Sequence, residues 1–149
     1  MDHFREFVHL APPDLPTESV RNSLAEEARR LAARGVQHFR TDDLDEAEAA
    51  FRRCVFLCPD DVPYQCQLGQ VLMLTGRAGL EEAEALFAEA IEAQRRDGLD
   101  PSRPLLFLAN ALLMLDRRTE AEQLAREFLA DPGDANPEIV RQIRRLFDG

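Results

Sequence analysis

The residues best suited to chemistry are three cysteines, Cys54, Cys58 and Cys66, together with His38. Thiolates and imidazoles are ligands that zinc prefers, and a thiolate beside an imidazole can act as a nucleophile. The spacing favours neither use, because no C-x₂-C or H-x₃-H motif is present. Cysteine also serves as a small buried hydrophobe. We therefore expect structural thiols and no metal site, with a cysteine-based redox or metal module as the lesser alternative.

The sequence lacks the residues that several other kinds of catalysis require. All 18 basic residues are arginine, and the absence of lysine excludes Schiff-base, phosphate-loop and kinase chemistry. None of the few serines stands in a G-x-S-x-G elbow. The acidic run at 42–46 lacks the glycine and the final glutamate of a calcium loop, so helix capping explains it better. These absences predict a protein that is not an enzyme and needs no cofactor.

Composition bounds the class of protein. A chain of 149 residues with 45% hydrophobic and 31% charged residues fits one globular domain. Its net charge of −10 disfavours nucleic acid and anionic membranes as partners. The first residues carry acids where a signal peptide is basic, and no apolar run approaches the ~18 residues of a membrane span. With few, clustered cysteines, this predicts a reducing, cytoplasmic location.

A repeated pattern organises most of the chain. An alanine is followed four residues later by an aromatic or small residue, and another small residue lies 12 to 14 positions upstream. The three copies are Gly35…Ala47…Phe51, Gly69…Ala83…Phe87 and Ala109…Ala121…Ala125. A period of this length indicates stacked supersecondary units. The small residues would lie where the two helices of a unit touch, and the phenylalanines would fill the space towards the next unit.

Helix signals divide each unit into two helices. Ser23 with Glu26 forms a capping box for a first helix over 23–40, and Asp43 would cap the second. In the next units we expect a break over 76–79 with a helix from Leu80, and a helix starting after Pro104. Asn136 followed by Pro137 starts a last amphipathic helix.

These signals predict an all-α fold, a right-handed α-α superhelix of about three helix pairs with a C-terminal capping helix. The expected parts are an N-terminal extension over 1–22 and a repeat domain over 23–149. Within that domain we expect units of about 23–60, 61–100 and 101–132, and a cap over 136–148.

The units resemble tetratricopeptide repeats, whose pattern is W-x₂-L-G-x₂-Y…A-x₃-F…P. Leu68-Gly69, Ala47-x₃-Phe51…Pro59 and Ala83-x₃-Phe87 match it over about residues 24–131. The tryptophan is absent, and the tyrosine of the first helix is replaced by His38, Leu72 and Leu112. The resemblance implies a protein-binding module.

In such a stack the first helix of each unit lines the concave side, so counting from the small residues predicts a peptide groove. The predicted groove residues are Ala32, Val36, Phe39, Arg40, Cys66, Gln70, Met73, Leu74, Leu106, Asn110, Leu113 and Met114. This surface is mainly apolar, and its methionines suit adaptable binding. The resemblance also raises the family's carboxylate clamp, but the lack of lysine argues against it.

The head of the chain carries a short apolar stripe. Phe4, Phe7, Val8 and Leu10 stand at helical spacing before a proline-rich stretch. Self-association through Phe4, Phe7 and Val8, giving a homodimer, is one expectation. Docking back on the repeats, or a loosely ordered terminus, are the alternatives.

A narrower resemblance concerns function. The stretch from Phe39 to Asp61, with Phe51 and Cys54, is similar to the first repeat of the small acidic chaperones of bacterial type III secretion that escort translocators. This resemblance implies a non-catalytic chaperone or adaptor that holds an extended segment of a client protein in its groove. The alternative is a structural subunit of a larger assembly.

Overall fold

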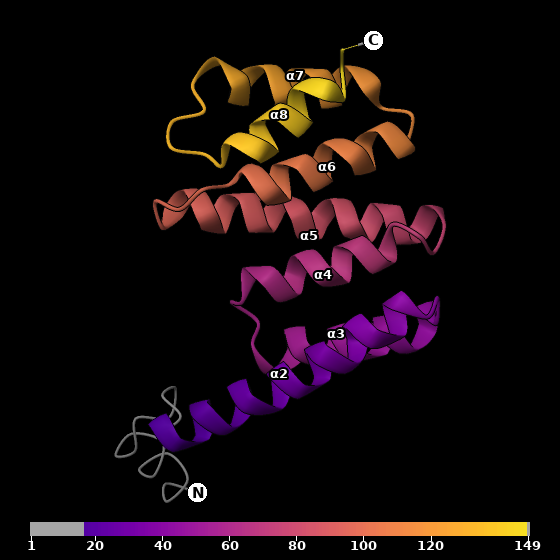
Figure 1. The fold of residues 1–149 in the computed structure, drawn as a ribbon, viewed down its shortest axis with the longest axis vertical. Helices are drawn as coiled ribbons and strands as arrows, with labels where there is room; N and C mark the ends of the chain where they lie inside the picture. The colour runs from indigo at the N-terminus through magenta and orange to yellow at the C-terminus, as the bar shows by residue number, and fades with distance from the viewer. Residues whose placement is uncertain (1–16, 149) are drawn as a thin grey trace, which may run out of the picture.

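The computed structural model describes residues 17–148, and this part of the chain consists of α-helices without a strand (Figure 1). In order, they are α2 (Glu18–Arg40), α3 (Leu44–Leu57), α4 (Val62–Leu72), α5 (Arg77–Arg96), α6 (Ser102–Met114), α7 (Arg118–Ala130) and α8 (Pro137–Arg145). The apolar stripe at Phe4–Leu10 lies outside the described residues.

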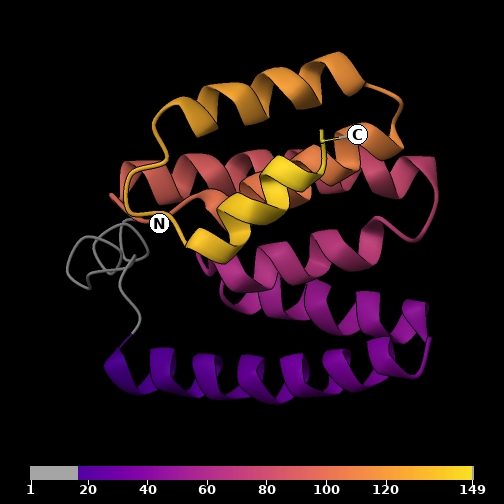
Figure 2. The same ribbon diagram turned by 45° about the horizontal axis from the view of Figure 1, so that its top comes forward.

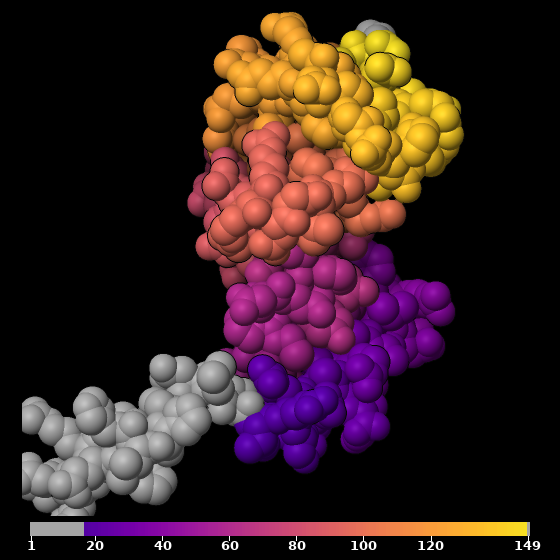
Figure 3. Space-filling view, turned by 90° about the vertical axis from the view of Figure 1, so that its left-hand side faces the viewer, coloured from indigo at the N-terminus to yellow at the C-terminus, as the bar shows by residue number. Residues whose placement is uncertain are grey.

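The helices form three antiparallel pairs, α2–α3, α4–α5 and α6–α7, and the pairs stack along the long axis of the molecule (Figures 1 and 3). The final helix α8 packs on α6 and α7 and crosses α6 obliquely (Figure 2). This is the all-α superhelix of three pairs with a terminal helix that the repeat pattern predicts.

The pairs are joined unequally. The second helix of one pair packs on the first helix of the next, α3 on α4 and α5 on α6. The first helices α4 and α6 also touch directly, whereas α2 is joined to the rest of the stack mainly through α3. The seam between the first and second pairs is therefore open on the side of the first helices.

Small residues set the distance between the helices of a pair, as the repeat pattern predicts. A Cβ atom on Gly69 would lie 2.5 Å from the ring of Phe87, and one on Gly35 would lie 2.8 Å from Phe51 Cζ. Each ring therefore lies on the glycine of its own unit. Phe87 also contacts the next unit, since its ring centroid is 5.4 Å from that of Phe107. The phenylalanines thus fill space both within and between units.

Several helix boundaries differ from expectation. Helix α2 begins at Glu18, five residues before Ser23, and Thr17 caps it by accepting from the Val20 N–H at 3.2 Å. Residues 18–22 therefore belong to the first helix and not to an extension. Ser23 is an exposed residue inside this helix.

The predicted start of α5 at Leu80 is also wrong. The helix begins at Arg77, because only Gly76, with φ 102°, leaves the helical region. Gly79 stays helical and is buried against the Leu72 carbonyl and Thr75, where a larger residue has no room. Likewise α6 begins at Ser102, and Pro104 is accommodated in its first turn, where no N–H is needed.

The cap predicted for α8 is correct, the one predicted for α3 is correct only by position, and α4 is capped by Asp61. Asn136 Oδ1 accepts from the N–H groups of Glu138 and Ile139, which starts α8. Asp61 Oδ1 accepts from the Tyr64 N–H, with Pro63 in the first turn of α4. Asp43 precedes α3 as expected, but its carboxylate makes no capping bond and lies 3.7 Å from His38 Nδ1 instead.

Arginines join the second helices along the outside of the stack. Arg52 of α3 donates to both carboxylate oxygens of Glu82 on α5, at 2.7 and 2.8 Å. Arg117, just before α7, donates to Glu84 of α5 at 2.6 Å. These ion pairs join residues of neighbouring units.

Candidate peptide-binding groove

The first candidate site is an apolar hollow between α2 and α4, with a volume of about 80 Å³. It is lined by Val36, Phe39, Phe51, Gln67, Gln70 and Val71. Three of the predicted groove residues, Val36, Phe39 and Gln70, therefore meet in one place. Phe39 lies at the edge of this apolar hollow with 39% of its surface exposed. The open seam between the first two pairs creates the hollow, because α2 and α4 pack through α3.

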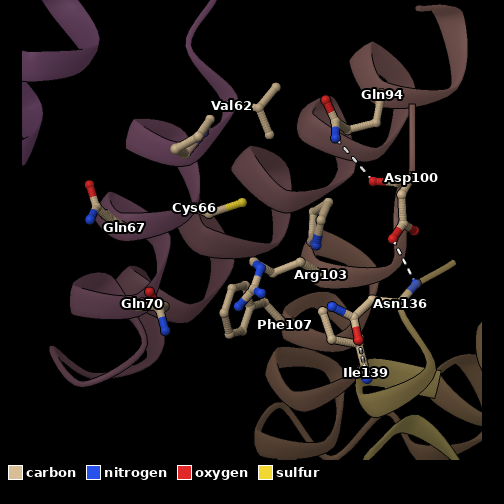
Figure 4. Close-up of a pocket in the computed structure, with 12 residues that line it drawn as sticks. Val62, Cys66, Gln67, Gln70, Gln94, Asp100, Arg103, Phe107, Asn136 and Ile139 are labelled. Atoms are coloured by element: carbon tan, nitrogen blue, oxygen red, sulfur yellow. Dashed lines mark hydrogen bonds between the residues drawn. The ribbon is translucent and has the colours of Figure 1, made fainter. Parts of the chain in front are cut away.

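The second candidate site is a larger pocket of about 430 Å³ formed by α4, α6, the end of α5 and the start of α8 (Figure 4). Its lining comprises Val62, Pro63, Cys66, Gln67, Gln70, Gln94, Asp100, Arg103, Pro104, Phe107, Asn136 and Ile139. We call it the polar pocket. It contains two predicted groove residues, Cys66 and Gln70.

Hydrogen bonds hold one wall of the polar pocket. Asp100 Oδ1 accepts from the Ser102 N–H, and Asp100 Oδ2 accepts from the Asn136 N–H, both at 2.9 Å. Gln94 Nε2 donates to the Asp100 carbonyl at 3.0 Å (Figure 4). Burial opposes ionisation of the Asp100 carboxyl, but the two N–H donors outweigh it, so the pKa of Asp100 lies below its ordinary value. The wall therefore carries a fixed negative charge.

Opposite this wall stand the groups free to meet a ligand. Arg103 is exposed, and its side chain lines the pocket together with Phe107 (Figure 4). Gln67 Oε1 is buried and has no hydrogen-bond partner among the described residues. Amides and a guanidinium beside apolar surface suit a polypeptide main chain with its side chains.

Gln67 and Gln70 line both the apolar hollow and the polar pocket. The two sites therefore share a wall on α4 and lie side by side across the first helices. We use "groove" for this combined surface. An extended peptide could cross all three units along it.

An apolar edge borders the groove where the first helices end. Leu74 and Met114 each expose 53% of their surface, and Phe39 lies at the matching end of α2. In Figure 1 these three ends lie at the same side of the stack. Met73 and Leu113 are half-buried against the core, and Arg40 is exposed.

The remaining predicted residues lie outside both cavities. Ala32 is half-buried against the core, and Leu106 is buried with 8% of its surface exposed. Asn110 is half-buried, and its Nδ2 donates to the Leu106 carbonyl of its own helix at 3.2 Å. The amide of Asn110 is therefore partly occupied, and its role in setting a client's register stays a prediction.

Counting from the small residues missed part of the groove, although a signal was present. Arg103 and Pro63 lie one turn before Leu106 and Cys66, so the same helical face continues to them. Phe107 and Gln67 occupy equivalent positions, two residues before Ala109 and Gly69. The contribution of Asn136 had no signal, because it depends on where α8 packs.

The cysteines show the features of structural thiols. Cys54 Sγ is buried and lies 3.3 Å from the Ala28 carbonyl oxygen, to which it donates. Burial raises the pKa of Cys54 and of Cys66 to about 11, and the pKa of Cys58 is also raised. Such thiols stay protonated near neutral pH. Among residues 17–148, no cluster of three or more His, Cys, Asp and Glu side chains could hold a metal ion.

Solved structures with this fold are tetratricopeptide-repeat domains. The N-terminal domain of stress-induced protein-1 (STI-1) from C. elegans is similar with a TM-score of 0.65 and 17% identity, over 83% of this chain and 96% of that one. The Arabidopsis OM64 TPR domain is similar with a TM-score of 0.63 and 16% identity, over 83% and 97%. No protein-family model and no curated protein matches the sequence. The chain therefore has a tetratricopeptide-like fold.

None of the helices between residues 17 and 148 combines the length and the apolar character that a membrane crossing requires.

Proposed function

We propose that the protein is a non-catalytic adaptor or chaperone that holds an extended segment of a client protein in the groove. The observation that carries this proposal is that Gln67 and Gln70 line both the apolar hollow and the polar pocket, which places the two cavities next to each other. The apolar hollow would take an apolar client side chain. The amides and Arg103 in the polar pocket would bind the client's main chain and polar groups.

Finer features of this function rest on the sequence. The first-repeat resemblance supports a chaperone of bacterial type III secretion that acts on a translocator in the cytoplasm. Self-association through Phe4, Phe7 and Val8 would add a homodimer, which light scattering on the purified protein would detect. These are proposals about the same groove-bearing protein.

The exposed apolar edge supports a second candidate function. Leu74 and Met114 could contact a folded neighbour, which would make the protein a structural subunit of an assembly. The two functions differ in where the partner binds. An assembly partner would depend on Leu74 and Met114, which line neither cavity, and would be insensitive to changes inside the apolar hollow.

The test compares the variants Phe39→Ala and Phe56→Ala. A client would first be captured in the native host and identified by mass spectrometry. The affinity of each variant for the purified client would then be measured. We expect Phe39→Ala to weaken binding by about 2 kcal/mol, roughly thirtyfold, because the ring borders the hollow. Its denaturation midpoint should change little, since the ring is partly exposed.

Phe56→Ala is the matched control, because Phe56 is 76% exposed on α3 and lines none of the cavities described. It should change neither affinity nor stability. If Phe39→Ala reduced stability strongly while the folded protein kept its affinity, Phe39 would be a core residue and the groove proposal would be wrong.

A further inference from the structure

The apolar hollow leaves apolar surface uncovered by the described residues. Val36, Val71 and Phe51 wall it, and Phe39 remains partly exposed at its edge. An engineered apolar cavity of ~150 Å³ binds benzene, so a hollow of this size takes part of an aromatic ring. The occupant must be apolar and must be able to reach the concave side of α2.

Residues 1–16 meet both requirements. They contain Phe4, Phe7, Val8 and Leu10, and they directly precede Thr17, the cap of α2. Phe39 lies 22 residues after Thr17, which is about 33 Å along a helix. Phe7 lies ten residues before Thr17 and can reach about 33–36 Å in extended form, and Phe4 reaches about 43–47 Å. Phe4 can therefore arrive at the hollow with length to spare for the reversal of direction, whereas Phe7 reaches it only in a fully extended chain.

The occupant carries a small charge, and one cation lies near the hollow. Residues 1–16 carry Asp2, Glu6 and Asp14 against Arg5, which gives 1 − 3 = −2 with histidine neutral. Arg40, the residue next to Phe39, is exposed and has the opposite sign.

We propose that residues 1–16 turn back along α2 and lie in the groove of their own chain, with Phe4 or Phe7 in the apolar hollow. The inference rests on the proposed function, because the segment would occupy the place of a client and would have to be displaced. There are two alternatives: residues 1–16 pair with a second copy of the chain, or they stay in solvent.

The experiment exploits the absence of tryptophan from the chain. Phe7→Trp in the full-length protein introduces the only tryptophan, whose emission and quenching by acrylamide report its exposure to water. We expect a blue-shifted emission and weak quenching that do not change with protein concentration. Adding Phe39→Asp should move the emission to that of an exposed tryptophan, because the charge would destroy the apolar contact. Adding Phe56→Asp instead should leave it unchanged.

Each other result overturns the proposal. An exposed tryptophan in Phe7→Trp means that the segment stays in solvent, provided that Phe4→Trp behaves alike. If the tryptophan is buried but its emission does not change in the presence of Phe39→Asp, the segment docks elsewhere on the protein. A shift that disappears on dilution means that a second copy is the occupant. None of these outcomes touches the proposed function, which is decided separately by client affinity in Phe39→Ala.

Discussion

At the scale of single residues, two glycines determine how closely the helices of the first two pairs approach each other. The Phe87 ring is fully buried on Gly69, and the Phe51 ring is buried in the same way on Gly35. The repeat pattern predicted that the small residues lie between the helices of a unit, but it placed the phenylalanines towards the next unit and not on the glycines of their own. It predicted the groove less completely, because cavities also depend on neighbours such as Arg103 and Asn136 that enter from other turns and helices.

The first prediction at this scale concerns Gly69→Ala. The new methyl group would lie 2.5 Å from the Phe87 ring, so the buried ring must move. Overpacking costs ~1–3 kcal/mol, against a gain in helix propensity of up to about 1 kcal/mol. We expect a net loss of stability in chemical denaturation.

The control for Gly69→Ala is the double variant with Phe87→Leu, in which the smaller side chain leaves room for the methyl group. The cost of Gly69→Ala should be smaller in that background, which a double-mutant cycle measures. Equal costs in both backgrounds would show that the ring contact does not set the helix distance.

At the scale of helices, the sequence located every described helix but misplaced several ends. Two glycines at 76 and 79 resembled one long break, although only Gly76 needs a positive φ. Ser23 had a complete capping box, yet Thr17 starts the helix earlier. Local signals compete, and which one ends a helix depends on packing that a single segment does not reveal.

The second prediction concerns Asp100, which connects the start of α6 to the residue that caps α8. Its folded pKa is lowered, so its contribution to stability is present above the unfolded value, ~3.9, and is lost as pH falls through the folded pKa. We expect Asp100→Ala to be less stable than the parent at neutral pH. Denaturation at a series of pH values should show this difference shrinking below about pH 4.

Asp100→Asn separates charge from geometry, because the amide oxygen can still accept one N–H. It should lie between the parent and Asp100→Ala at neutral pH. A stability difference for Asp100→Ala that is constant from neutral to acid pH would contradict the role of the carboxylate.

At the scale of the whole molecule, the stack behaves as a chain of nearest neighbours, since each pair contacts only adjacent elements. The terminal helix α8 covers the last pair through Ile139, Val140 and Ile143, and Ile143 is completely buried. The sequence predicted this cap from its apolar stripe. Loss of the cap should therefore reduce stability mainly at the C-terminal end of the stack.

The third prediction tests this with Ile143→Ala. Removing a buried isoleucine costs ~2–5 kcal/mol, and we expect faster amide hydrogen exchange in α6, α7 and α8, with α2 and α3 almost unchanged. Exchange resolved by peptide mass spectrometry gives the comparison. An equal loss of protection in all helices would indicate a single cooperative unit in place of a nearest-neighbour stack.

The open seam between the first two pairs has a mechanical consequence. Because α2 is joined to the stack mainly through α3, a small rotation about the α3–α4 contact changes the width of the apolar hollow without breaking packing between α2 and α4. The direct contact between α4 and α6 resists the same rotation at the polar pocket. We therefore expect the apolar hollow to change its width more easily than the polar pocket, so that it accepts side chains of different size.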